Sequence, residues 1–276
     1  MVRFASLMLT TLALSACGVP AEQAETPAPA PAKVEKPAPA PAPEAAADDR
    51  KAPASTRDPA ACKDAERPQP VDVATLEPMT LGEDANPALK DVALAADTAP
   101  ELYKVNFETS EGNFVVEVHR DWAPIGADRF YNLVKIGYFD DIRTFRNIGN
   151  FMVQFGIHGA PEVNAVWSEA RIKDEPVKMG NKRGIITFAK CGAPDCRSTQ
   201  VFINHKDNTM LDPQGFAGFG RVIEGMDVVD KLYACYGEGA PRGMGPSQGL
   251  IQSKGNAYLD AGWPNLSRIV KATVVE

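Results

Sequence analysis

The chain has 276 residues, 44% of them hydrophobic, and a formal net charge of −7 at pH 7. This length and composition suit one or two globular domains with polar attachments. The negative charge argues against nucleic acid as the main partner, because binding to phosphates depends on basic residues. No Gly-rich phosphate loop, Ser-His-Asp signature or internal repeat stands out.

Residues 1–17 have the pattern of an export signal, with Arg3 as the basic flank. The apolar run 4–16 is too short to span a bilayer comfortably. Leu14-Ser-Ala-Cys17 resembles the bacterial lipobox, in which the Cys is lipidated and becomes the new N-terminus. We therefore expect a lipid anchor on Cys17; the alternative is an ordinary cleaved signal followed by an incidental Cys. Gly18 in the next position resembles lipoproteins sorted to the outer membrane of a Gram-negative envelope.

Residues 18–61 are dominated by Ala, Pro, Glu and Lys, with alternating Ala-Pro runs at 27–31 and 37–43. Such a segment cannot bury enough apolar surface to offset the entropy of ordering. Alternating Ala-Pro favours extended polyproline II, so about 40 residues would reach on the order of 120 Å. We interpret this segment as a disordered tether that holds a folded domain away from a membrane. A proline-rich ligand for another domain is the alternative.

The next stretch, 62–100, has apolar residues without a clear period, and 86–94 could make a short helix. We expect it either to pack on the following domain as an extension or to be partly disordered.

Residues 101–276 predict a mainly β domain. A turn signal at 110–113 joins two segments of alternating apolar residues and indicates a hairpin. Helical spacing is confined to the segment after Pro124, which Gly137 ends, and the segment after Gly225. The expected strands are 102–108, 113–119, 142–147, 151–157, 184–190, 200–204, 216–222 and 268–275. Many short strands with two helices suit a closed antiparallel β-barrel that the helices cap.

Two short segments of this domain place polar residues among apolar ones. Met152 and Gln154 should share one face of a strand, because they alternate with Val153 and Phe155. The spacing of Arg146, Phe151, Met152 and Gln154, followed later by Gln200, Phe202 and Ile203, by Leu211-Asp212 and by Phe219-Gly220-Arg221-Val222, resembles the cyclophilins. These are barrel-shaped peptidyl-prolyl isomerases. The resemblance covers about two thirds of the chain, roughly 101–276, and implies eight strands and isomerase activity.

Prolyl isomerisation explains why one cation would be needed here. Rotation about a peptide bond faces a barrier of about 18–20 kcal/mol, because the C–N bond has partial double-bond character. No bond is broken, so neither a metal nor a cofactor is required. The nitrogen of a twisted amide accepts a hydrogen bond that the planar amide cannot accept, so a guanidinium would stabilise the twisted state selectively. The resemblance gives this role to Arg146; the alternative is a surface ion pair with an Asp such as Asp140.

The resemblance also supplies the rest of a substrate site. Gln154 and Gln200 would hold the substrate backbone through their amides. Phe151, Met152, Phe202 and Leu211 would form an apolar pocket for the proline ring, although any one of them alone would suggest a core residue.

Three departures from the family pattern fall among the expected substrate-binding positions. Lys190-Cys191-Gly192 stands where the family usually has Ala-Asn-Ala, so the fit of Cys191 and Gly192 to substrate is altered. Met210 replaces the Trp of many eukaryotic members, which predicts weak cyclosporin binding. Phe216 replaces a His, which exchanges a polar contact for an aromatic wall. We expect reduced or altered activity at worst.

Of the 5 Cys, lipidation of Cys17 leaves an even number in an oxidising compartment. Our hypothesis pairs Cys191 with Cys196 beside the active site and Cys62 with Cys235 between the extension and the barrel. Spacing cannot decide the pairing, and free buried thiols are the alternative. The 3 His residues, His119, His158 and His205, have no ligand spacing, so structural roles are expected for them and no metal site.

The sequence therefore predicts a cyclophilin that is lipid-anchored in the cell envelope, faces the periplasm and isomerises Xaa-Pro bonds in envelope proteins. A monomer is expected, with proline-containing polypeptides and the membrane as partners. The alternative, from another functional class, is a binding module or holdase that grips proline-containing segments without catalysis. Natural clients and the preference for the residue before proline are not encoded in any pattern we recognise.

Overall fold

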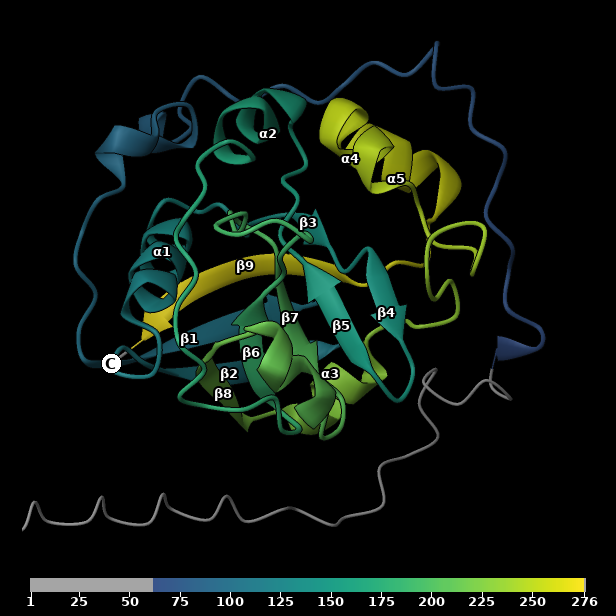
Figure 1. Cartoon of the computed structure of the whole chain (residues 1–276). Coiled ribbons are helices and arrows are strands. Elements are labelled where there is room, and N and C mark those ends of the chain that lie inside the picture. Colours follow the sequence, from purple (N-terminus) through teal and green to yellow (C-terminus); the bar gives the residue numbers. More distant parts are fainter. Residues whose placement is uncertain (1–61, 276) are drawn as a thin grey trace, which may run out of the picture. The chain divides into compact units, whose positions relative to one another are not determined.

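The computed structural model describes residues 62–275 (Figure 1). The expected signal, Cys17 and the tether 18–61 lie outside these residues. Within 62–275, every helix is too short or too polar to cross a bilayer.

The described residues form one antiparallel sheet of nine strands in the order β3-β9-β1-β2-β8-β6-β7-β5-β4. The strands are β1 Leu102–Thr109, β2 Gly112–His119, β3 Ile142–Arg143, β4 Arg146–Ile148, β5 Met152–Phe155, β6 Ile185–Phe188, β7 Val201–Asn204, β8 Gly218–Glu224 and β9 Arg268–Val275. The predicted hairpin is confirmed: β1 and β2 pair along their whole length, and Thr109 faces Gly112 at the turn.

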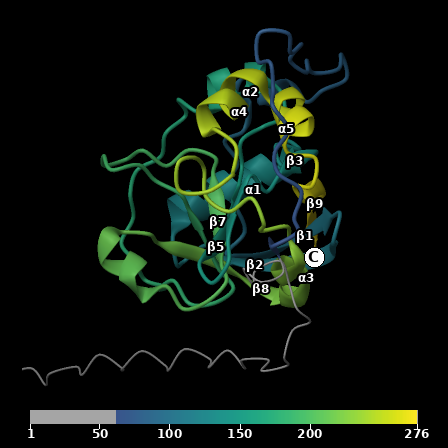
Figure 2. The same cartoon turned by 90° about the vertical axis from the view of Figure 1, so that its right-hand side faces the viewer.

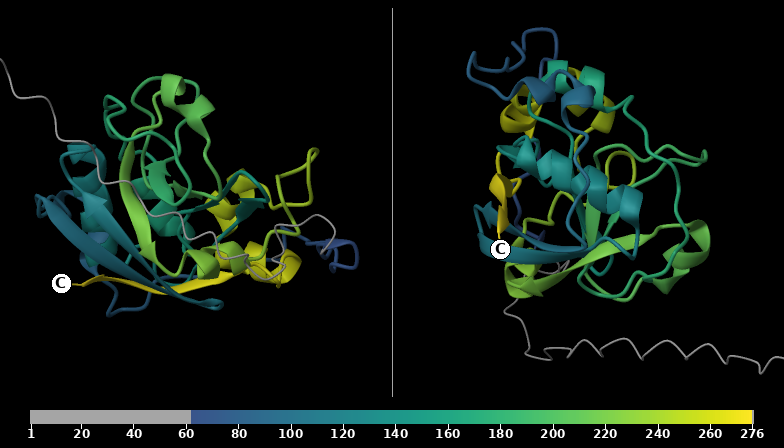
Figure 3. Two further views of the ribbon diagram at one scale, coloured as in Figure 1. Left: turned by 90° about the horizontal axis from the view of Figure 1, so that it is seen from below. Right: turned by 90° about the vertical axis from the view of Figure 1, so that its left-hand side faces the viewer.

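This sheet differs from the closed eight-stranded barrel that we expected. It is mainly antiparallel β and strongly curled (Figure 3), but within 62–275 its edge strands β3 and β4 are not paired with each other. The single strand expected at 142–147 is divided, because β3 pairs with β9 whereas β4 pairs with β5. Thr144 lies at the division, and both its backbone N–H and its hydroxyl donate to the Ser267 carbonyl. The segment thus pairs with β9 in its first part and with β5 in its second, so it forms two strands and the sheet has nine.

The prediction of two helices is also wrong. The described residues contain α1 Pro124–Lys135, α2 Pro161–Trp167, α3 Met226–Lys231, α4 Gln248–Lys254 and α5 Asn256–Gly262. The two expected helices correspond to α1 and α3. The other three have seven residues each, which gives too few turns for an apolar period to be recognised. Helices α2, α4 and α5 gather at one end of the sheet (Figure 2), where α4 contacts both of the others.

The main apolar core lies between the inner face of the sheet and α1. Alternation places Val105 and Phe107 of β1 and Val116 and Val118 of β2 in this core, each fully or almost fully buried. The ring of Phe107 stacks on that of Phe114 with centroids 4.8 Å apart. Val153 and Phe155 of β5 also enter this core, so their neighbours Met152 and Gln154 face the other way.

The stretch 62–100 packs on the rest of the chain. In place of the short helix expected at 86–94 it has two 3-10 turns, Pro87–Leu89 and Val92–Leu94. Ala88 and Leu89 are buried in the main core, and the Trp167 indole N–H donates to their carbonyls at 3.2 and 3.1 Å. The hypothesis that Cys62 and Cys235 form a disulfide is confirmed, so this stretch is also covalently joined to the domain.

Candidate active site

Three neighbouring strands bring the predicted site residues into one row. Arg146 of β4 faces Gln154 of β5, and Gln154 faces Phe202 of β7. Directly opposed residues of an antiparallel sheet lie on the same face with Cβ atoms about 5 Å apart. Residues that are distant in the sequence are therefore adjacent because of strand register alone.

A cavity of about 480 Å³ lies over this row. Its apolar part is a small cluster separate from the main core, in which Met152, Phe202 and Leu211 are 1%, 5% and 7% exposed and Phe151 and Phe216 pack against them. The rings of Phe202 and Phe216 meet edge to face with centroids 5.7 Å apart. We call this cluster, with Ile148 and Ala189 at its margin, the apolar cup.

Polar groups form a connected chain along one side of the cavity. The Arg146 guanidinium donates from Nη1 to Gln154 Oε1 at 2.8 Å, and Gln154 Nε2 donates to Gln200 Oε1 at 2.7 Å. Because Arg can only donate, it fixes the orientation of both amides in turn. On its other edge, Arg146 donates from Nε and Nη2 to the two carboxylate oxygens of Glu238 at 2.8 and 2.7 Å. Arg146 Nη1 also lies 3.9 Å from Met152 Sδ, at the wall of the apolar cup.

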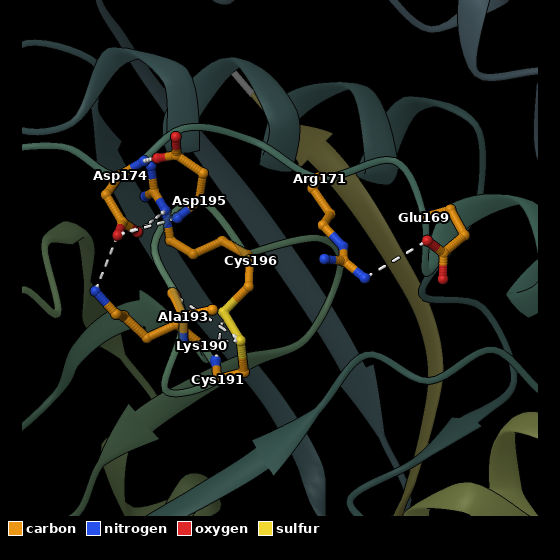
Figure 4. The surroundings of a disulfide bond; sticks show 9 residues. Glu169, Arg171, Asp174, Lys190, Cys191, Ala193, Asp195 and Cys196 are labelled. Carbon is orange, nitrogen blue, oxygen red and sulfur yellow. Dashed lines mark hydrogen bonds and ion pairs between the residues drawn. A yellow bond between two sulfur atoms is a disulfide. The ribbon is translucent and has the colours of Figure 1, made fainter.

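The loop before Gln200 is closed by the disulfide between Cys191 and Cys196, as hypothesised (Figure 4). Lys190 lies 3.1 Å from the carboxylate of Asp174, which also accepts from the Asp195 backbone N–H. Although burial alone disfavours the charged carboxylate, hydrogen bonds from Lys190 and the Asp195 backbone lower the pKa of Asp174. The loop is thus held by the Cys191–Cys196 disulfide and by the ion pair between Lys190 and Asp174.

A buried ion pair lies beneath this loop. Arg197 is 2% exposed and donates to Glu175 Oε2 at 3.0 Å. The Glu175 carboxylate also accepts from the backbone N–H groups of Ile125 and Gly126 in the first turn of α1, at 2.6 and 2.9 Å. A carboxylate near a helix N-terminus is favourable, because the first N–H groups have no partner within the helix. This contact links the loop to α1.

Most of the site residues named from the sequence line this one cavity. They are Arg146, Phe151, Met152, Gln154, Cys191, Gln200, Phe202, Leu211 and Phe216. Gly192 and Met210 are not among the lining residues, and Met210 is 51% exposed on the 3-10 segment Thr209–Gln214. Phe151 reaches the cavity although it should alternate with Met152, because it precedes β5 in a turn where Asn150 has φ of 59°.

Sequence reasoning missed several residues. Ala189, Ser198 and Gln248 line the cavity and were not named from the sequence, whereas Lys190 and Cys196, which also line it, belong to the loop that the sequence placed beside the site. The ion-pair partner suggested for Arg146 is wrong: Asp140 accepts from the Ala272 backbone N–H, whereas Arg146 binds Glu238. No sequence signal could have identified Glu238, because it lies 92 positions from Arg146 on a loop.

The three histidines lie in three separate environments. His119 stacks on Trp122, with ring centroids 4.0 Å apart, and His205 Nε2 lies 2.8 Å from Asn147 Oδ1. His158 Nδ1 accepts from the Ala160 backbone N–H at 2.9 Å. Burial lowers the pKa of His158 to about 4, so this ring is neutral near pH 7.

Taken together, the cavity offers an oriented guanidinium, two amides and an apolar cup, with Lys190 on the disulfide-closed loop. The arrangement has the chemistry to bind an apolar ring in the cup and polar groups along the row of amides.

Comparison with known proteins identifies the family. Residues 104–246 match the family model described as cyclophilin type peptidyl-prolyl cis-trans isomerase/CLD. A peptidyl-prolyl cis-trans isomerase of Acinetobacter baylyi is 37% identical over 133 residues, 46% of this chain and 70% of the relative. Peptidyl-prolyl cis-trans isomerase B of Escherichia coli is 32% identical over 136 residues, 46% of this chain and 82% of the relative. A solved cyclophilin type peptidyl-prolyl cis-trans isomerase of Cryptosporidium parvum has a TM-score of 0.47 at 22% identity, and the match covers 63% of this chain and 98% of that chain.

This chain belongs to the cyclophilin-type peptidyl-prolyl cis-trans isomerases, so the resemblance noted in its sequence is confirmed. The family match ends at residue 246, and helices α4 and α5 lie beyond it.

Proposed function

We propose that this protein catalyses rotation of Xaa-Pro bonds in the cavity above β4, β5 and β7, and that Arg146 is its main catalytic residue. The observation that carries this proposal is the placement of Arg146 Nη1 beside the apolar cup. A proline ring seated in the cup would present its amide nitrogen to the guanidinium. That nitrogen becomes a hydrogen-bond acceptor only when the amide is twisted, so Arg146 would stabilise the transition state more than either planar isomer.

The two glutamines would hold the peptide on either side of the rotating bond. The Oε1 atoms of Gln154 and Gln200 already accept from Arg146 and Gln154, so the amide nitrogen of Gln200 is the terminal donor of the chain. We assign this donor to a substrate carbonyl. A neutral amide costs less to desolvate than a charge, which suits a site that must also be apolar.

Catalysis can be distinguished from simple binding with full-length protein and a short Ala-Pro peptide. At a small molar fraction of protein, NMR exchange spectroscopy should show cross-peaks between the cis and trans forms of the peptide, which exchange in tens to hundreds of seconds without a catalyst. A peptide with Ala in place of Pro is the control. Resonances that shift and broaden without such cross-peaks would contradict catalysis and would support a binding module or holdase.

We also propose that the protein works in the cell envelope, attached through a lipid on Cys17 and facing the periplasm of a Gram-negative cell. The lipobox pattern ending at Cys17 supports this, as do the two disulfides, because disulfides persist in oxidising compartments. Two or three acyl chains would anchor it stably. Its substrates would be proline-containing envelope proteins. We also expect a monomer; a dimer mass in sedimentation analysis would contradict that.

The anchor predicts a clear difference between the native protein and Cys17→Ser. In cells supplied with labelled palmitate, the native protein should take up label and fractionate with the outer membrane, whereas Cys17→Ser should take up none. The double variant Cys191→Ser, Cys196→Ser is the control, because it removes other Cys residues and breaks only the smaller disulfide. Absence of label from the native protein would contradict lipidation.

A further inference from the structure

The bidentate contact between Glu238 and Arg146 is a part of the active site that the catalytic proposal does not use. Both carboxylate oxygens are occupied, at 2.8 and 2.7 Å, and the side chains of Arg146 and Glu238 are 23% and 20% exposed. A bidentate pair fixes the plane of the guanidinium as well as its position. With Nε and Nη2 held, Nη1 is the nitrogen left beside Gln154 and the apolar cup.

We propose that Glu238 is a positioning residue that orients the catalytic guanidinium, and that the C-terminal helices and the N-terminal extension exist in part to hold it in place. This inference rests on the catalytic role proposed for Arg146.

The loop that carries Glu238 is folded tightly around it. The Gly245 N–H donates to the Glu238 carbonyl at 2.8 Å, and the Gly239 N–H donates to Glu238 Oε1 at 3.0 Å. At Gly243, a Cβ would overlap the Glu238 carbonyl oxygen, so no other residue fits this conformation without movement. Hydrogen bonds within its own loop therefore hold the Glu238 carboxylate in position independently of its contact with Arg146.

A third apolar cluster, separate from the main core and the apolar cup, supports the base of this loop. Tyr236 is 2% exposed and packs with Tyr258 and Leu259 of α5. The Trp263 indole N–H donates to the Met244 carbonyl at 2.7 Å. Helix α5 lies outside the residues that match the family model, so this support is additional to the part of the chain shared with the relatives.

The N-terminal extension completes the support. Val71, Val73 and Leu76 pack against the same cluster, and the Gln69 N–H donates to the Gly262 carbonyl at 2.9 Å. The disulfide to Cys62 joins the loop at Cys235, three residues before Glu238. Two segments from opposite ends of the described chain therefore converge on one loop.

Two effects of Glu238 on catalysis oppose each other. An Arg side chain that is not held must be ordered in each turnover, which costs up to about 2 kcal/mol, or about thirtyfold in rate. A carboxylate also offsets part of the positive charge that stabilises the twisted amide. The Arg146 hydrogen bonds lower the pKa of Glu238, so the carboxylate is charged near pH 7. We expect the benefit of holding the Arg146 side chain in place to outweigh the partial offset of its charge. With Glu238 present Arg146 still carries its charge, whereas without Glu238 its side chain would seldom be in the catalytic position.

The experiment is a double-mutant cycle in full-length protein, read as kcat and KM on an Ala-Pro peptide. Glu238→Ala should lower kcat about tenfold with KM within twofold, and Glu238→Gln, which keeps one acceptor, should lose less. In an Arg146→Ala background, Glu238→Ala should cause no further loss. The matched control is Asp128→Asn, which removes a pair of the same geometry: Arg120 Nε and Nη2 donate to the two carboxylate oxygens of Asp128 in α1 at 2.8 and 3.1 Å, and neither residue lines the cavity. This control should leave kcat unchanged.

Each result decides between the two proposals. Full activity of Glu238→Ala, or a rate above that of the native protein, would overturn the positioning role and leave the role of Arg146 intact. An equal loss from Glu238→Ala in both backgrounds would overturn it as well, because the effect would then not act through Arg146. Full activity of Arg146→Ala would remove the catalytic proposal and this inference with it. If Glu238→Ala does not fold, Glu238→Gln in the two backgrounds gives the same comparison.

Discussion

Replacing Arg146 by Ala is expected to lower kcat/KM for a proline-containing peptide by about 10²- to 10³-fold, the usual effect of removing one well-placed hydrogen-bond donor from a transition state. The guanidinium lines the cavity, donates to Gln154 and lies beside Met152 at the wall of the apolar cup. Lys190, the other cation among the lining residues, is held by Asp174 beside the disulfide loop. It is therefore not expected to replace Arg146.

A conservative substitution tests whether position matters in addition to charge. Arg146→Lys keeps the charge, but Lys cannot bind both oxygens of Glu238 and donate to Gln154 at the same time. We expect Arg146→Lys to lose nearly as much activity as Arg146→Ala, as measured in a protease-coupled isomerisation assay. A Lys variant with native activity would show that a positive charge alone is sufficient.

Loss of the Cys62–Cys235 disulfide is expected to have the largest effect on stability. The two residues are 173 positions apart, and closing a loop of that size restricts the unfolded chain by about 5 kcal/mol in the chain-entropy model. The Cys191–Cys196 bond spans 5 positions, and the same model gives about 2 kcal/mol for it. Each pair should be changed to Ser and the free energy of unfolding measured in urea.

The two double variants control for each other, since each removes one disulfide and adds two hydroxyls. The Cys62/Cys235 variant should lose clearly more stability, and it should also lose activity because Glu238 follows Cys235 closely. Equal losses in the two variants, or none in either, would contradict this account of the disulfides.

Local patterns were sufficient to predict much of the fold. Strict alternation in the first two strands, with a turn between them, predicted the hairpin of β1 and β2, which the structure confirms. The same rule placed Met152 and Gln154 on one face. Four Cys allow three pairings, and spacing alone could not choose among them. The hypothesis that the structure confirms depended on which residues were expected to lie close together in the fold.

Features that depend on distant contacts were not predictable. The division between β3 and β4 arises because each half pairs with a different neighbouring strand. Helices α4 and α5 are short, are separated by Gly255, and are stabilised by packing with the extension, so their own sequences carry little helical signal. Glu238 reaches Arg146 through a loop whose position depends on those helices. The cup and the amides could therefore be inferred, but the group that orients the cation could not.

The central claim, that a fixed guanidinium favours the rotated amide over both flat forms, is tested most directly by NMR line-shape analysis of a bound Ala-Pro peptide. This measurement separates the dissociation constants of the cis and trans peptides from the interconversion rate on the protein. For Arg146→Ala we predict that both dissociation constants stay within about threefold of native, whereas interconversion slows at least about 100-fold. Weakened binding of both isomers with unchanged interconversion of the bound peptide would contradict the claim.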